Sequence, residues 1–190
     1  MKKNLITAFL MTIATTVLLG VAYPLLITGL AQIVFRDKAN GQLLYRNGEA
    51  VGSRIIAQPF VSAKYFHPRP SAAGNGYDAA NSGGTNFAPT NQKLIDRVKT
   101  DASTLHQEHP DQPVPVDLVT TSASGLDPDI SPAAAQFQIA RVAHERGISE
   151  PALRELVQKY TYQRDLGLLG EPRVNVLELN LALDDRSAKP

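Results

Sequence analysis

Hydrophobic positions divide the chain into one long apolar run and a patterned remainder. Residues 5–35 contain no charged residue, and 22 of these 31 positions are apolar. A run of more than about 18 such residues predicts a transmembrane helix. As a single α-helix the run would be about 46 Å long, against a hydrocarbon layer of about 30 Å. We therefore expect a core span at about residues 8–30 and a kink at Pro24, which lacks the N–H of a regular helix.

A cleaved secretory signal peptide is the alternative interpretation of this run. Lys2 and Lys3 precede it, and Gly20-Val21-Ala22 is similar to a cleavage site. The apolar part of a signal peptide ends after about 7–15 residues, whereas this run continues to Phe35. We therefore expect residues 1–4 to be a short stub and residues 5–35 to stay attached as a membrane anchor.

Small and polar residues recur at every fourth position of the run. We call this set the small-residue row: Ala8, Thr12, Thr16, Gly20, Pro24, Thr28 and Gln32. Positions four apart form a ridge on a helix, and small or hydroxylated residues allow a second helix to approach closely and to form hydrogen bonds. We predict that Thr12, Thr16, Gly20, Pro24 and Thr28 bind a partner helix. The alternative is a chance arrangement in a plain anchor.

The remainder of the chain, residues 36–190, predicts one mixed α+β domain. It contains a long loop at 67–91 that is rich in Gly, Pro and Asn. Capping and turn signals predict the regular elements. These are a hairpin in 40–60 around Asn47-Gly48 that includes Ile55-Ile56, a helix from a Thr90 cap to Glu108, a strand at 116–121, and helices at 132–146, 149–162 and 176–183. A strand remains an alternative for 176–183, because Leu177, Leu179, Leu181 and Leu183 alternate.

Charge bears on topology and on partners. Residues 36–190 contain 17 Lys and Arg against 18 Asp and Glu, and this balance, without a basic run, argues against a nucleic-acid partner. Basic residues are almost equal on the two sides of the span, but a large domain can be translocated regardless of its charge. We therefore expect a cytoplasmic N-terminus and an extracytoplasmic C-terminal domain.

Little in the sequence indicates catalysis. The chain has no Cys, which excludes thiolate metal sites and cysteine nucleophiles, and it has no phosphate-binding or hydrolase motif. We interpret His106 and His109 as residues of a helix end, and Asp127 and Asp129 as turn residues. One weak candidate is an anion cradle, formed by the backbone N–H groups of Ser82, Gly83, Gly84 and Thr85 with Lys93.

Several segments together resemble the C subunit of the bacterial Kdp-type potassium-transporting P-type ATPase. Two lie before the helix predicted from the Thr90 cap, at Tyr65-Phe66-His67-Pro68-Arg69-Pro70-Ser71 and Ser82-Gly83-Gly84-Thr85-Asn86. The more specific ones follow, at 122–131 and in Leu169-Gly170-Glu171-Pro172-Arg173-Val174-Asn175-Val176-Leu177. The resemblance extends over nearly the whole chain.

The resemblance implies an accessory, non-catalytic subunit in the bacterial inner membrane. Its partners would be a potassium-channel-like subunit, a P-type ATPase subunit and a small single-span subunit, together with membrane lipid. The family is also described as a catalytic chaperone that raises the ATP affinity of the pump subunit, and this would place ATP near Ser82-Gly83-Gly84. That site conflicts with the expected topology, because cytoplasmic ATP could not reach it. The alternative function is a membrane-tethered enzyme or ligand-binding domain that acts alone.

Overall fold

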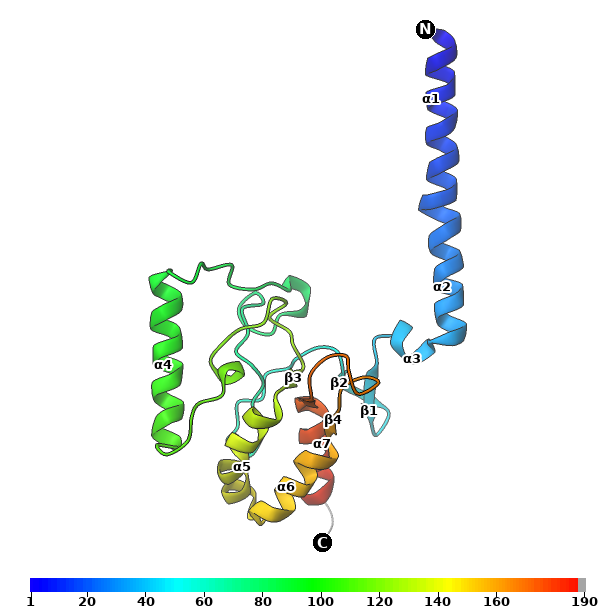
Figure 1. Ribbon diagram of the computed structural model, residues 1–190. Coiled ribbons are helices and arrows are strands. Elements are labelled where there is room, and N and C mark those ends of the chain that lie inside the picture. The colour runs from blue at the N-terminus through cyan, green and yellow to red at the C-terminus, as the bar shows by residue number, and fades with distance from the viewer. Residues whose placement is uncertain (188–190) are drawn as a thin grey trace. The chain divides into compact units, whose positions relative to one another are not determined.

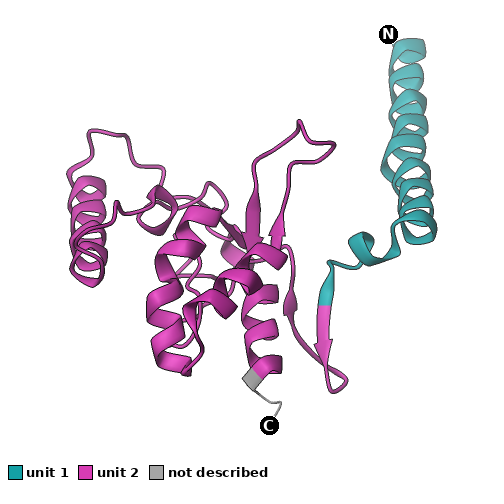
Figure 2. Ribbon diagram, turned by 60° about the horizontal axis from the view of Figure 1, so that its bottom comes forward, with its two compact units in different colours: residues 1–43 teal, residues 44–190 magenta. Residues whose placement is uncertain are grey.

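The computed structural model describes residues 1–187, which form two compact units that meet between residues 43 and 44 of the chain (Figure 2). The first unit is dominated by one helix of 33 residues, Lys2–Val34. It comprises α1 (Lys2–Thr15), a π-helical segment (Thr16–Ala22) and α2 (Tyr23–Val34), and a short helix α3 (Arg36–Ala39) follows. The residues expected as a stub therefore belong to the helix from Lys2 onward.

A π-helical segment stands where we expected a kink. The N–H of Tyr23 donates to the carbonyl of Leu18, five residues earlier, and the helix continues through Pro24 into α2. Such local widening is one way in which a helix accommodates a proline that cannot donate. The structure thus adjusts the backbone before Pro24 and keeps one continuous helix (Figure 1).

The second unit begins with a hairpin and a long irregular segment. β1 (Leu43–Arg46) and β2 (Glu49–Ser53) form a two-stranded sheet, and Asn47 and Gly48 between them both have positive φ, which confirms the predicted turn. β2 ends at Ser53, so the expectation that Ile55-Ile56 belong to the strand was wrong. The predicted loop contains one short 3-10 turn, Ala79–Asn81.

Helix α4 (Gln92–Glu108) begins one residue later than expected. Its cap is Asn91, whose side-chain oxygen accepts from the N–H of Lys93 at 2.9 Å, so the assignment of Thr90 was wrong. Asn is among the best capping residues because its side chain reaches this N–H. No residue of α4 is fully buried; its ribbon runs to one side of α5–α7 (Figures 1 and 2), and partly buried Leu105 packs against the core.

The predicted strand at 116–121 is instead a 3-10 turn, Val116–Leu118, with buried Leu118. The next helix matches its prediction: α5 (Pro132–Arg146) has the Ser131 hydroxyl as its cap, bonded to the N–H of Ala134 at 3.0 Å, and Gly147 ends it in the left-handed region. Helix α6 (Glu150–Lys159) is shorter than predicted, because the residues after it form β4.

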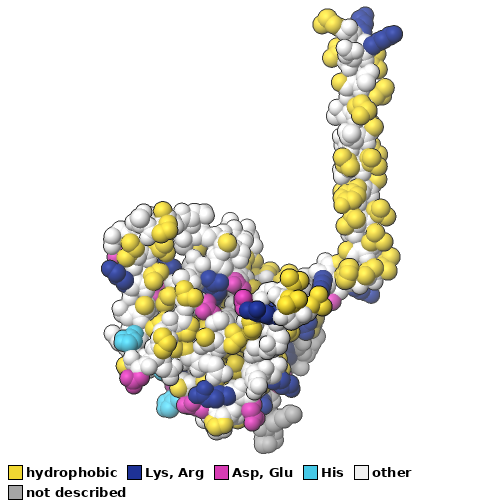
Figure 3. All heavy atoms as spheres, viewed as in Figure 1, with side chains coloured by type: hydrophobic (Ala, Val, Ile, Leu, Met, Phe, Trp, Pro, Cys, Tyr) yellow, Lys and Arg dark blue, Asp and Glu magenta, His cyan; other side chains and the backbone are white. Residues whose placement is uncertain are grey.

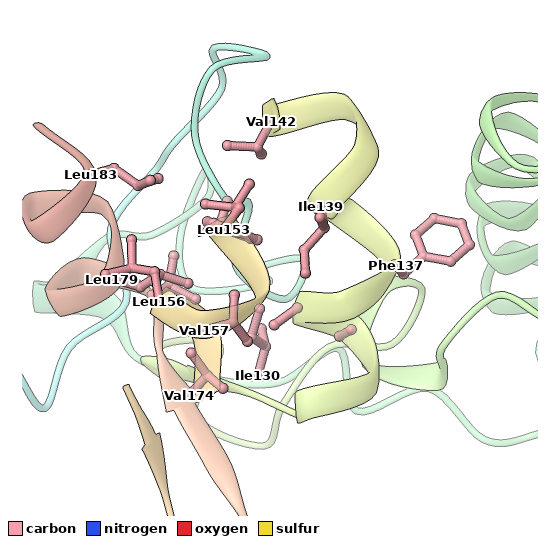
Figure 4. Packing of buried hydrophobic residues seen from close by; sticks show 14 of the residues in the cluster. Ile130, Phe137, Ile139, Val142, Leu153, Leu156, Val157, Val174, Leu179 and Leu183 are labelled. Atoms are coloured by element: carbon pink, nitrogen blue, oxygen red, sulfur yellow. The ribbon is translucent and has the colours of Figure 1, made fainter. Parts of the chain in front are cut away.

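A three-stranded antiparallel sheet and three helices enclose the core. The strand order is β3 (Asp129–Ile130), β5 (Arg173–Asn175) and β4 (Thr161–Tyr162), and α7 (Val176–Ser187) follows β5 directly. The Asn175 side chain accepts from the N–H of Glu178 at 3.2 Å, which confirms the helix over the alternative strand. Buried side chains of α5, α6, α7 and the sheet meet in one cluster (Figure 4). They include Ile139, Leu153, Val174 and Leu179, each fully buried.

Candidate functional site

The 33-residue helix has no cover within the described chain. None of its most apolar window is buried, and hydrophobic side chains lie along its whole length (Figure 3). The core helix of a water-soluble protein would be mostly buried, and exposing this much apolar surface to water is unfavourable. The helix therefore requires lipid, protein or both around it, and its length and composition suit a membrane span.

The π-helical segment determines where the small-residue row lies. An α-helix turns about 100° per residue, so residues four apart are offset by about 40° around the helix axis. Four such steps, from Thr12 to Thr28, give an offset of about 160°. A π-helical turn holds about 4.4 residues, so each of its residues turns the chain by less than a residue of an α-helix does. In ideal geometry the seven residues Thr16–Ala22 therefore reduce this offset by about 125°. The segment thus brings both ends of the predicted partner-binding set toward one side of the helix.

The side chains of the row differ in what they can offer a partner. The Thr12 hydroxyl already donates to the Ala8 carbonyl at 2.9 Å, whereas within residues 1–187 the hydroxyls of Thr16 and Thr28 have no hydrogen-bond partner. A Cβ built on Gly20 would meet only the Thr16 methyl group, at 3.8 Å. The row therefore presents open space at Gly20 and two hydroxyls that are available to another helix.

The predicted anion cradle has bonds of its own. The N–H of Gly83 donates to the Ser124 carbonyl at 2.8 Å, the Ser82 hydroxyl donates to the same oxygen at 3.0 Å, and a Cβ on Gly84 would lie 3.1 Å from the Ala123 carbonyl. Thr85 accepts from the N–H of Phe87. Gly84 thus allows a close approach of two backbone segments, and the N–H of Gly83 is already used.

Lys93 lies in the first turn of α4, and its backbone N–H is bonded to the Asn91 cap. In the part of the chain that the structure describes, no hydrogen bond or ion pair joins the Lys93 side chain to residues 82–85. Nucleotide binding by this set stays a prediction, and the geometry gives each loop residue a structural role.

Buried side-chain amides hold Phe66 and His67, two residues of the motif at 65–71 to which we assigned no role from the sequence. Phe66 is fully buried, and its N–H and C=O both bond to the amide of Asn180, each at 2.9 Å. The N–H and C=O of His67 bond to the amide of Gln138 at 2.8 and 3.1 Å. Two buried side-chain amides thus satisfy the backbone of two residues that belong to no strand in the described part of the chain. We call residues 63–69 the clamped segment.

Arginines and one tyrosine extend the clamp on both sides. Arg141 donates to the carbonyls of Ala63 and Tyr65, at 2.5 and 3.1 Å, and Arg146 donates to the Lys64 carbonyl at 2.7 Å. The Tyr65 hydroxyl donates to Asp184 of α7 at 3.1 Å. The segment is therefore fixed to both α5 and α7 by hydrogen bonds that only the folded chain can form.

A cavity of about 350 Å³ opens beside the clamped segment, lined by His67, Tyr77, Glu108 and Arg141 among others. Burial, and then the nearby Arg141 guanidinium, lower the pKa of His67 below its ordinary value. Its ring nitrogen Nε2 lies 3.1 Å from the Ser62 carbonyl, which suits a neutral imidazole that donates there.

Asp127 and Asp129 have structural partners, as the turn interpretation expects. Asp127 accepts from the N–H of Asp129 at 3.1 Å and pairs with Arg69 at 3.0 Å, while Asp129 accepts from Asn175 and pairs with Arg173 at 3.2 Å. The residues 1–187 contain no group of three His, Asp or Glu residues arranged to hold a metal ion.

Comparison with known proteins identifies the family. The family model for the K+-transporting ATPase, c chain, matches residues 5–185. The chain belongs to the KdpC family. A potassium-transporting ATPase KdpC subunit from Koribacter versatilis is 67% identical over 190 residues, covering 100% of this chain and 98% of the relative. The corresponding subunit of Acidobacterium capsulatum is 56% identical, over 96% of this chain and 98% of the relative. That of Rhodopseudomonas palustris is 54% identical, over 97% and 98%.

Membership of the KdpC family covers the apolar helix as well as the domain, because the match begins at residue 5. The motif Tyr65–Ser71, which carried the resemblance, contains most of the clamped segment. Its KdpC-like residues therefore lie where side chains of α5 and α7 fix the backbone. This motif is part of the domain's architecture.

Proposed function

We propose that this chain is an accessory subunit of an ATP-driven potassium uptake complex in the bacterial inner membrane, and that it assembles or stabilises the complex through its membrane helix. One observation carries the proposal: within residues 1–187 nothing covers the apolar helix, and its row of small residues presents an open glycine and two hydroxyls that have no partner in that part of the chain. Membership of the KdpC family supports it. The potassium-channel-like, P-type ATPase and small single-span subunits are the partners that we propose.

Gly20→Leu tests this docking face. A leucine at a close helix contact forces the two backbones apart, which costs about 1–3 kcal/mol and corresponds to roughly 5- to 150-fold weaker association. We expect less of the variant chain to co-purify with the channel-like subunit. Within this chain the substitution meets only the Thr16 methyl group, at 3.8 Å, so the helix itself should be unaffected.

Gly29→Leu is the matched control. It adds the same side chain to the same helix, but at a position next to Thr28 that is not part of the row. A Cβ there would have no neighbour within 4 Å. We expect normal co-purification of this control. Equal recovery of both variants would count against the row as the docking face.

The proposed topology places the N-terminus in the cytoplasm and the C-terminal domain outside. Single cysteines at Lys2 and His144 test it, since the chain contains no Cys and the His144 side chain is 86% exposed. An impermeant maleimide added to intact cells should label position 144 and not position 2. The reverse pattern would contradict the topology.

The effect on ATP affinity that the family resemblance implies acts, in this proposal, through contacts between subunits. The bonds already made by the N–H groups of Gly83 and Lys93 support this view. Titration of the full chain in detergent with ATP tests it, and a saturable signal in the millimolar range or below would assign ATP to the chain itself. Activity of the chain alone would favour a tethered enzyme or binding domain, for which the cavity beside His67 is the available site.

A further inference from the structure

The loop between β4 and β5 is orange in Figure 1, and three of its residues are exposed leucines. Leu166, Leu168 and Leu169 are 92%, 82% and 63% exposed. Single exposed leucines are ordinary, but adjacent ones that form an apolar patch mark a surface that another molecule covers. We call these three residues the leucine tip.

The backbone of the leucine tip is held in one shape. Asp165 and Leu169 exchange two hydrogen bonds, at 2.8 and 2.9 Å, and the N–H of Gly167 donates to the Arg164 carbonyl at 3.0 Å. Leu166 has a φ of +55°, a conformation that leucine rarely adopts. A contact surface that is fixed before binding loses little conformational freedom on binding, which favours a specific protein pocket.

Charges around the leucine tip distinguish a protein partner from an anionic lipid surface. Arg164 pairs with Glu171 at 2.6 Å, and Arg173 pairs with Asp129 at 3.2 Å. Loops and helices that bind anionic lipid carry an excess of basic residues toward the headgroups. Here both nearby arginines have acidic partners within the chain, and Asp165 adds a further carboxylate, so the tip combines an apolar end with a polar surround that has no excess of basic residues. This composition fits the apolar core and polar rim of a protein interface.

We propose that the leucine tip inserts into an apolar pocket on another subunit of the potassium-transporting complex. The inference rests on the proposed function, because it requires that the chain be assembled with other subunits. It adds a second contact, made by the C-terminal domain, to the one made by the membrane helix. A second copy of this chain is a poorer occupant, because two protruding tips offer each other no pocket.

Photocross-linking in the assembled complex tests the partner. A benzophenone amino acid in place of Leu168 should form one adduct with another subunit of the complex after irradiation in native membranes. The same group in place of His144, whose side chain is 86% exposed on α5, is the matched control and should form none. An adduct with lipid, an adduct with a second copy of this chain, or no adduct would each overturn the proposal.

Two sets of substitutions test the chemistry. Changing all three leucines to Ser should weaken retention of the chain in the complex at least 10-fold, whereas changing all three to Met should retain at least half of the binding. Both sets should leave thermal unfolding of the chain unchanged, since the three leucines are exposed. Equal binding by the Ser and Met variants would overturn the proposal.

The two proposals fail separately. If Gly20→Leu assembles normally but the benzophenone at position 168 still marks a subunit, the leucine tip stands and the membrane row does not. If Gly20→Leu prevents assembly but the unaltered helix assembles without any cross-link at position 168, the leucine tip is refuted alone.

Discussion

The position of the clamped segment depends strongly on the side-chain amide of Asn180. Its side chain is 1% exposed and bonds both the N–H and the C=O of Phe66, 114 residues away in sequence. Asn180→Leu keeps the number and branching of the side-chain heavy atoms but removes both bonds and leaves two buried backbone groups without partners. Each such group costs about 1–3 kcal/mol, so we expect a loss of about 2–6 kcal/mol from an unfolding free energy of about 5–15 kcal/mol.

A second substitution separates hydrogen bonding from packing. Asn180→Asp keeps the oxygen that accepts from the N–H of Phe66 but replaces the amide donor with an oxygen that faces the Phe66 carbonyl. It should therefore be strongly destabilising although its shape is almost unchanged. Asn81→Ala, at an exposed position that bonds Asp78, is the surface control and should change stability by less than about 1 kcal/mol.

The assay is urea unfolding of the detergent-solubilised chain, followed by far-UV circular dichroism, with the unfolding free energies compared between variants. If Asn180→Leu lies within 1 kcal/mol of the unaltered chain, the clamp contributes little and the reasoning fails. The same conclusion follows if Asn180→Asp is as stable as the control.

Two further predictions concern the same domain. Burial and Arg141 lower the pKa of His67, so as pH falls the unfolded chain takes up a proton near the ordinary pKa of 6.5 before the folded chain does. The free energy of unfolding should therefore decrease as pH drops below about 6.5. In urea unfolding, His67→Gln should flatten that pH dependence. Gly125→Ala should destabilise by more than about 2 kcal/mol, because φ is +67° and the added Cβ would lie 2.5 Å from the Gly83 carbonyl and 2.7 Å from the Ala73 nitrogen. Gly147→Ala, at φ +64° with no atom within 4 Å of its Cβ, should lose about 1–2 kcal/mol, and an equal loss at both glycines would contradict the packing argument.

Elements whose signals are local in sequence could be predicted. The helix Pro132–Arg146 follows from Ser131 at its start and Gly147 after its end, and the helix after Asn175 follows from one cap and the spacing of Leu179 and Leu183. The stretch at 116–121 was wrongly predicted as a strand, because Leu118 packs into the core from a 3-10 turn while Val116 is exposed. Periodicity cannot separate these two uses of a short apolar run.

The clamped segment could not be predicted for a different reason. Asn180 and Gln138 lie 114 and 71 residues from their backbone partners, and no local pattern distinguishes an amide that bonds a distant backbone from one on the surface. For the membrane helix, the row of small residues was visible in the sequence, but the π-helical segment that turns it toward one side was not.

The central claim is that this KdpC-family chain enters its complex through one side of its membrane helix. Tryptophan scanning of residues 8–32, in a chain that has no Trp of its own, measures it directly as the fraction of each variant recovered with the other subunits. We predict that the recovered fraction falls when Trp replaces Thr12, Thr16, Gly20 or Thr28, and that it stays normal when Trp replaces Leu18 or Leu26. Recovery that does not depend on position, or that falls mainly at Leu18 and Leu26, would contradict it.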